Sequence, residues 1–405
     1  MTGLLAALTL QAGYNATLVT LGAALLGLAA GATGTFLFLR KRALVADAVA
    51  HATLPGVGLA FLAMVALGGD GRSLPGLLIG SAVTAGLGLL VMEWIARRTR
   101  LAEDAAIGAV LGSFFGLGVV LLTVIQTMSA GRQAGLEGFL LGSTAGMLFQ
   151  DGLVIAAGGT AAVLATWLLR RPMTLVAFDP GYAAALGYDV RRIDLAMMGL
   201  VMAVTVIGLK VVGLILIVAM LIIPTVTARF WTQRAGRVVW IAGAIGGLSG
   251  YLGAAISASA PALPTGPIIV LMAAGAFVLS LFFAPVRGVL ASALRHRRFQ
   301  ARVHRRQGLL ALARHDPIRE PFTLRLLRRE GLIRPDGVAT DRGRAQAARV
   351  LREERRWAEA RSLHQDTGLT GRYDGLTPIE EVFTPDEIAE IDRRLGRPFA
   401  VPGGV

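Results

Sequence analysis

The sequence predicts an all-α polytopic membrane protein with a small cytoplasmic α+β domain at its C-terminal end. Of its 405 residues, 54% are hydrophobic and the mean hydropathy is +0.63, which is too apolar for a soluble protein. Apolar runs of about 20 residues recur without the alternation of barrel strands, so a helical bundle is the spanning structure that fits. After Pro285 the chain becomes rich in arginine, which marks the end of the membrane part.

The apolar runs predict eight or nine membrane spans. They fall at about 17–39, 44–68, 76–96, 105–128, 152–169, 194–209, 211–228, 238–259 and 267–284. Residues 136–149 resemble a half-helix, and residues 207–213 are expected to form a tight bend that joins two spans. The sequence has no cysteine, which excludes disulfides, zinc–thiolate sites and iron–sulfur clusters.

The basic residues predict the orientation of these spans. With nine spans and the N-terminus outside, three basic residues fall in outer loops, namely Arg72, Arg132 and Lys210. The thirteen in inner loops are Arg40, Lys41, Arg42, Arg97, Arg98, Arg100, Arg170, Arg171, Arg191, Arg192, Arg229, Arg234 and Arg237. This asymmetry follows the positive-inside rule and places the C-terminal part in the cytoplasm. The net charge of +14 therefore gives no indication of nucleic-acid binding in the membrane part.

One segment, residues 44–62, places an acid, an imidazole and a proline inside an apolar run. Asp47 and His51 are four residues apart, which on a helix puts both on one face with Cβ atoms roughly 5–6 Å apart, a chelating distance. Pro55 cannot donate a hydrogen bond to the His51 carbonyl, so an interrupted helix and a third oxygen ligand are expected. The alternative is a capping acid and a packed histidine. The cost of burying ionisable groups in a bilayer favours a metal or proton site.

The largest predicted inner loop, residues 170–194, contains a short amphipathic helix. Asp179 is expected to cap it before Pro180, and Gly187 is expected to end it. Such a helix would either bind a cytoplasmic partner or lie in the membrane interface.

The sequence divides into a membrane domain at 1–286, a basic linker helix at 287–308 and a winged-helix-like domain at 309–405. In the last of these, short helices are expected at 309–314 and 322–330, two strands around the turn at 335–337, and a longer helix at 341–363. No glycine-rich phosphate loop is present, so nucleotide hydrolysis by this chain is not expected.

Six stretches together resemble the permease subunits of bacterial ABC transporters for manganese, zinc or iron. They are RKRALVADAVAHATLPGVGLAFL at 40–62, EDAAIGAVLGSFFGLGVVLL at 103–122, LEGFLLGSTAGM at 136–147, AFDPGYAAALGY at 177–188, VVGLILIVAMLIIPTVTAR at 211–229 and LPTGPIIVL at 263–271. The resemblance covers nearly all of residues 17–285. It implies a multi-pass transport subunit of the bacterial cell membrane, not an enzyme, with a separate cytoplasmic ATP-binding subunit and an extracellular metal-binding lipoprotein as partners.

The resemblance also implies roles for particular residues. Asp47 and His51 match the metal-pathway pair of the family. The segment that matches its coupling helix, which docks on the ATPase, comprises Asp179, Pro180, Ala184, Leu186 and Gly187.

Three other acids lie near the ends of predicted spans. Glu103 and Asp104 match the family's acidic pair, but we interpret them mainly as N-cap and dipole partners of the following span rather than as a transit site. Glu93 is expected to pair with Arg97 one turn later.

The ligand chemistry independently favours a pair of subunits. One acid and one imidazole supply two ligands, whereas a divalent ion takes four to six. Two subunits packed about a two-fold axis would bring two carboxylates and two imidazoles to one ion, and the second permease is either identical or a paralogue. This donor set suits manganese, the first choice, or zinc or iron, as transported substrate, with no covalently bound cofactor. The main rival is a proton-coupled secondary metal transporter that uses Asp47 and His51 as a proton relay.

The tail resembles iron- or manganese-dependent repressors in part, at 338–360 and 378–396. One expected helix lies where a helix-turn-helix needs two, which argues against reading DNA. Positions where the repressors carry metal-binding histidines are Glu354, Tyr373 and Glu381 here, so a metal sensor is not expected. We expect a scaffold for the ATPase or the partner permease, with a membrane-tethered DNA-binding regulator as the second rival.

Overall fold

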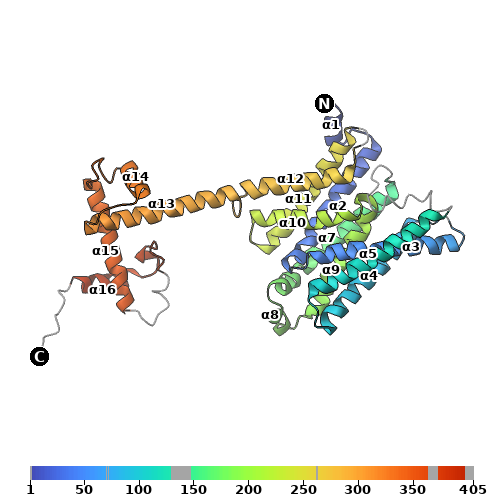
Figure 1. The fold of residues 1–405 in the computed structure, drawn as a ribbon, viewed down its shortest axis with the longest axis horizontal. Helices are drawn as coiled ribbons and strands as arrows, with labels where there is room; N and C mark the ends of the chain where they lie inside the picture. The colour runs from blue at the N-terminus through green and yellow to red at the C-terminus, as the bar shows by residue number, and fades with distance from the viewer. Residues whose placement is uncertain are drawn as a thin grey trace. The chain divides into compact units, whose positions relative to one another are not determined.

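The computed structural model describes residues 2–69, 71, 73–128, 147–260, 263–363 and 373–396. The chain divides into two compact units, Met1–Ala291 and Ser292–Val405. Figure 1 shows the first unit as a bundle of long helices, and the second as a mixture of long and short helices joined by loops.

The helices of the first unit follow the apolar runs. In chain order they are α1 (Thr2–Leu8), α2 (Tyr14–Leu39), α3 (Leu44–Ala66), α4 (Leu74–Arg98), α5 (Glu103–Thr127), α7 (Phe149–Phe178), α8 (Pro180–Ala185), α9 (Val190–Val212), α10 (Leu214–Trp231), α11 (Ala235–Ala258) and α12 (Thr265–Phe283). Among the described residues, eight of these helices are long and apolar enough to cross a membrane. The all-α polytopic prediction is therefore confirmed for this unit. The remaining predicted run, 211–228, corresponds to a shorter apolar helix, Leu216–Trp231, within α10.

Two helices form the interior of this bundle. α2 packs against α7, α9, α10 and α11, while α3 packs against α4, α5 and α9; Figure 1 shows α3, α4 and α5 side by side. Glycines allow close backbone approach at both helices. A Cβ at Gly27 would lie 2.2 Å from the carbonyl oxygen of Gly246 on α11, and one at Gly56 would lie 2.1 Å from that of Gly80 on α4. Small residues allow close helix packing in membrane proteins generally. Helices in lipid associate through such packing contacts, because the hydrophobic effect does not drive their association there.

One boundary differs from the sequence-based prediction, and one agrees. α7 continues as a helix to Phe178, whereas a loop was expected from Arg170. The Arg170 guanidinium lies 4.6 Å from the ring centroid of Trp167, so this charge is accommodated on the helix. The predicted bend at 207–213 is found at Gly213, whose φ of 83° separates α9 from α10. The stretch expected to form a half-helix, 136–149, lies outside the described residues except for its last three positions.

The second unit is helical in its described residues. Its elements are α14 (Pro321–Arg329), α15 (Asp341–Leu363), the 3₁₀ helix η3 (Ile379–Glu381) and α16 (Pro385–Leu395), preceded by α13 (Val289–Arg314), which begins in the first unit. Residues 309–314 are the end of α13 and not a separate helix.

The predicted α+β winged-helix-like class is not supported for this unit. The two expected strands are reduced to a single antiparallel bridge between Ile333 and Ala339, with no strand among the described residues. The turn between them is closed by a hydrogen bond from the Gly337 amide to the Arg334 carbonyl. The segments on either side of this turn are too short to form further strand pairs. Thr340 already caps the next helix, because its hydroxyl accepts a hydrogen bond from the Gly343 amide.

Candidate metal site on α3 and its surroundings

The predicted metal pair lies on one face at the start of α3. Asp47 is in the first turn and His51 in the next, and Nε2 of His51 lies 3.4 Å from Oδ1 of Asp47. This contact follows from the four-residue spacing, which places the two side chains one above the other. The structure therefore brings together the two residues that the sequence singled out.

The environment of His51 leaves one ring nitrogen without a partner. The imidazole packs edge-on against Phe115 of α5, with ring centroids 4.9 Å apart, and its side chain is 18% exposed. Nδ1 is buried and has no hydrogen-bond partner in the described part of the chain. The Asp47 side chain is 38% exposed. A buried nitrogen normally finds a partner, but Nδ1 is closed off from solvent, so the ring atom placed to share a ligand with the accessible Asp47 carboxylate is Nε2.

The chain by itself supplies an incomplete coordination shell. Within the described ranges, no group of three or more histidine, aspartate or glutamate side chains is placed to hold a metal ion. Asp47 and His51 together offer one imidazole and one carboxylate, fewer than the four to six ligands of a divalent ion.

The expected interruption of the helix at Pro55 is absent. α3 runs unbroken from Leu44 to Ala66 with Pro55 buried inside it. Proline still cannot donate to the His51 carbonyl. The helix stays regular because its surroundings hold it: a Cβ at Gly118 of α5 would lie 2.5 Å from Cβ of Leu54 and 3.2 Å from the nitrogen of Pro55. Close packing on this side therefore prevents the opening that the proline alone would permit.

A charged cluster that sequence reasoning missed fixes the turn before α3. Arg40 donates from Nε and Nη2 to the two carboxylate oxygens of Asp194 on α9, both at 3.1 Å. Nε of Arg42 lies 2.6 Å from Oε1 of Glu103 on α5. Asp194 is almost fully buried, with 4% of its side chain exposed. The turn that leads into the Asp47 helix is thus linked to two other helices by ion pairs. The available signal was Asp194, an acid at the start of an apolar run.

Of the three acids predicted to cap or pair near helix ends, Glu93 has its expected partner, whereas Glu103 and Asp104 do not cap their helix. Glu103 and Asp104 occupy the first turn of α5, where they complement the helix dipole, but the N-cap residue is Ala102 and makes no side-chain capping bond. The N-cap assignment was therefore wrong. Glu93 is buried and pairs with Arg97 one turn later, as predicted.

The predicted short helix in the inner loop forms as α8. Oδ1 of Asp179 accepts a hydrogen bond of 2.8 Å from the Tyr182 amide, which caps the helix, and Gly187 ends it with a φ of 86°. Pro180 is its first residue, and Ala184 is exposed. Exposed, largely apolar side chains lie in α8 and directly after it: Tyr182 in the helix, and Leu186 and Tyr188 in the segment that follows.

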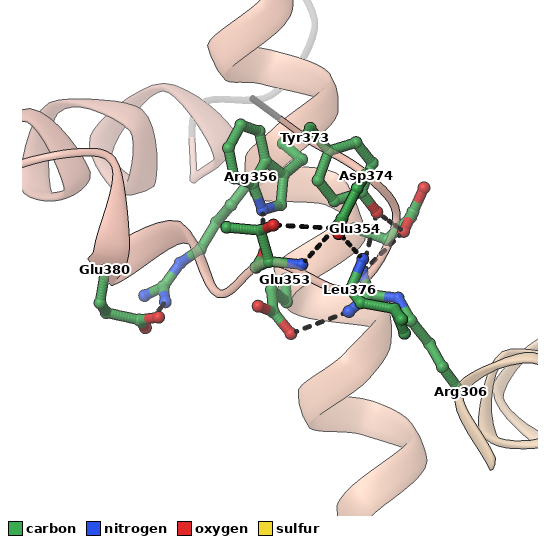
Figure 2. Close-up of polar contacts among 10 residues, drawn as sticks. Arg306, Glu353, Glu354, Arg356, Tyr373, Asp374, Leu376 and Glu380 are labelled. Atoms are coloured by element: carbon green, nitrogen blue, oxygen red, sulfur yellow. Dashed lines mark hydrogen bonds and ion pairs between the residues drawn. The ribbon is translucent and has the colours of Figure 1, made fainter. Parts of the chain in front are cut away.

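In the second unit, an arginine fills the space between two carboxylates (Figure 2). Nη2 of Arg306 donates to Oε2 of Glu354 at 3.0 Å and to the Tyr373 hydroxyl at 2.9 Å, and Nη1 lies 3.4 Å from Oε2 of Glu353. The Tyr373 hydroxyl also donates to Glu354 at 2.6 Å. Glu381 is exposed in η3 and stands outside this network. The guanidinium thus supplies the positive charge that a metal ion would bring to these carboxylates.

These contacts shift the pKa values of the cluster. Burial alone would raise the pKa of Glu354, but hydrogen bonds from Tyr373 and Arg306 outweigh it and hold this pKa below the usual value. Burial, together with the hydrogen bond to Glu354, raises the pKa of Tyr373 to about 12. The Tyr373 ring stacks on Trp357, with ring centroids 4.5 Å apart. The cluster is consequently a structural element of this unit, stable as an ionised carboxylate and a neutral phenol.

Comparison with known proteins agrees with this architecture. The manganese transport system membrane protein MntC of Bacillus subtilis is 42% identical over 298 residues, which are 74% of this chain and 67% of that protein. The zinc transport system membrane protein TroC of Treponema pallidum is 38% identical over 285 residues, 70% of this chain and 94% of that protein. A solved structure of PsaBC from Streptococcus pneumoniae in complex with Fab matches with a TM-score of 0.57 and 32% identity, covering 66% of this chain and 91% of that chain.

A family model gives the assignment. The ABC 3 transport family matches residues 14–284, which include every membrane-spanning helix described above and end before the tail. The repressor-like character of the tail therefore stays a prediction. From its fold and this match, the chain belongs to the ABC 3 transport family.

Proposed function

We propose that this chain is the permease subunit of an ABC importer for divalent metal ions, with manganese as the first candidate and zinc or iron as alternatives. The observation that carries the proposal is the Asp47 and His51 pair on α3, in which Nε2 of His51 lies 3.4 Å from Oδ1 of the accessible Asp47 carboxylate. Oxygen and imidazole donors suit these three metals. The names of the relatives, which refer to manganese and zinc transport, support the same substrate class.

The proposed assembly contains two permease subunits, a cytoplasmic ATP-binding subunit and an external metal-binding lipoprotein. Because this chain offers two ligands, a second permease must contribute the rest of the coordination shell. The exposed side chains of Tyr182 in α8 and of Leu186 directly after it are proposed to dock on the ATP-binding subunit at the cytoplasmic surface. The tail is proposed to lie in the cytoplasm as a scaffold for these subunits, and nucleic acid is not among the proposed partners.

Metal accumulation in cells that lack their own importer tests the site. Asp47→Ala and His51→Ala should each abolish accumulation while the protein remains inserted and assembled, because either change leaves a shell that cannot hold the ion. Asp104→Asn is the matched control, since this acid is exposed in the first turn of α5. Normal uptake by both α3 variants would remove the assignment. Uptake driven by a pH gradient without ATP would favour the secondary transporter instead.

Stimulation of ATP hydrolysis tests the role of α8. Replacing Tyr182 and Leu186 together by serine removes apolar contact area but leaves the Asp179 cap and Gly187 in place. We expect the ATP-binding subunit to lose its stimulation by the permease and the binding protein. Undiminished stimulation in this variant would exclude α8 as the coupling element.

A further inference from the structure

A pocket of about 660 Å³ opens where four helices of the first unit end. It is lined by residues at or next to the C-terminal ends of α2, α7 and α10 and by the segment that follows α12. Three aromatic side chains, Phe38, Phe178 and Phe230, are among its lining residues.

Three cationic side chains converge on this apolar pocket, namely Lys41, Arg229 and Arg287. None of them has a carboxylate partner among the residues that the structure describes, in contrast to Arg40 and Arg42 in the same turn. The backbone holds two of them in place. Lys41 adopts a left-handed φ of 63°, and the Arg287 amide donates to the Phe230 carbonyl at 3.2 Å. The result is a concentration of positive charge that no anion of this chain neutralises within the described ranges.

The depth of the pocket corresponds to the headgroup layer of a bilayer. α2 has 26 residues, so it is about 39 Å long and exceeds the roughly 30 Å hydrocarbon core, which leaves its end among the headgroups. Exposed aromatic side chains lie at the same helix ends, including Trp231 and Phe283. Aromatic residues are enriched at this level of a membrane. By the positive-inside rule, this end faces the anionic inner leaflet.

We propose that this pocket binds one anionic phospholipid, whose phosphate contacts Lys41, Arg229 and Arg287 and whose first acyl carbons contact Phe38, Phe178 and Phe230. A phosphodiester with an apolar chain complements both features of the pocket, whereas an acidic protein segment would leave the aromatic surface uncovered. Phe178 directly precedes Asp179, the cap of α8. A bound lipid would therefore support the base of the proposed coupling helix, and the lipid site itself does not depend on that role.

The test counts lipids retained by the full-length protein in detergent, using native mass spectrometry during titration with phosphatidylglycerol or phosphatidylcholine. We expect the unmodified protein to bind phosphatidylglycerol tightly and not phosphatidylcholine. Each cation near an anionic surface changes affinity about five-fold, so the triple variant K41Q/R229Q/R287Q should bind about 100-fold more weakly. Single variants should lose about five-fold each, which keeps the test valid if the triple variant fails to fold.

The matched control is R98Q/R100Q/R171Q, which removes three exposed cations predicted to lie on the same membrane surface but outside the pocket. Arg98, like Arg229, occupies the last turn of a helix. The control therefore distinguishes lipid binding in the pocket from a general effect of cations at helix C-termini. The control should bind phosphatidylglycerol as the unmodified chain does.

Several results would overturn the proposal. Unchanged binding by the pocket variants, or equal loss in the control, would show that diffuse charge is responsible. Complete displacement of the lipid by glycerol 3-phosphate would identify a site for free anions. If the triple variant keeps the lipid but no longer retains the ATP-binding subunit, the pocket docks a protein.

Discussion

Neutralising Asp194 should destabilise the membrane unit far more than neutralising an exposed acid nearby. In Asp194→Asn, Arg40 loses the negative charge and one of its two acceptor oxygens at 3.1 Å, at a site where the acid side chain is 4% exposed. Removing one partner of a buried ion pair costs about 3–5 kcal/mol, because the remaining charge stays desolvated. At roughly 2 °C per kcal/mol for a unit of this size, the thermal midpoint should fall by about 6–10 °C.

The matched control is Asp189→Asn. Asp189 pairs with Arg192, but both side chains are largely exposed, and asparagine can still cap α9 in its place. Such a pair contributes about 0–1 kcal/mol, so its midpoint should move by about 2 °C or less. Tryptophan fluorescence during heating measures both variants. Removing both charges in R40M/D194L should recover most of the loss, since no unpaired charge is left buried. Equal shifts for the two asparagine variants would refute the reasoning.

Two further predictions follow from packing and from the tail. Gly56→Ala should reduce folded protein and uptake sharply, because its Cβ would lie 2.1 Å from a backbone oxygen of α4. Gly116→Ala should be tolerated, because no described residue beyond its own stretch of α5 lies within 4 Å of its Cβ. Expression and uptake of the two variants test this difference. The pKa of Glu354 is lower in the folded protein than in the unfolded chain, where it is about 4.3. The ionised Glu354 therefore stabilises the fold at pH values above about 4.3, and this stabilisation is lost as the pH falls through the folded pKa. Tyr373, raised to about 12, should lose its contribution as pH rises from about 10 toward 12. Melting curves against pH for the unmodified chain and Glu354→Gln test both directions, and an acid limb that the variant does not flatten would contradict the assignment.

The spans and the contact between Asp47 and His51 could be predicted because their signals are local. Twenty apolar residues specify a spanning helix, and a four-residue spacing specifies that Asp47 and His51 meet. The cap and the end of α8 were equally local, since Asp179 and Gly187 act within one turn of the chain.

The features that were missed depend on contacts between distant residues. Arg40 and Asp194 are 154 positions apart, so the sequence showed a loop cation and an isolated acid rather than a pair. Pro55 was expected to interrupt α3, but the packing of Leu54 and Pro55 against Gly118 keeps the helix regular. Strand propensity around the turn at 335–337 was likewise outweighed, because α15 begins directly after it at Asp341.

The number of metal ions bound per assembled transporter tests the central claim most directly. Equilibrium binding of manganese to the purified, nucleotide-free assembly should give one ion per permease pair, lost in Asp47→Ala and in His51→Ala and retained in Asp104→Asn. Binding should also weaken as pH falls, because the imidazole must be neutral to bind a metal. One ion per chain, or unchanged binding in the two α3 variants, would contradict a shared site on α3.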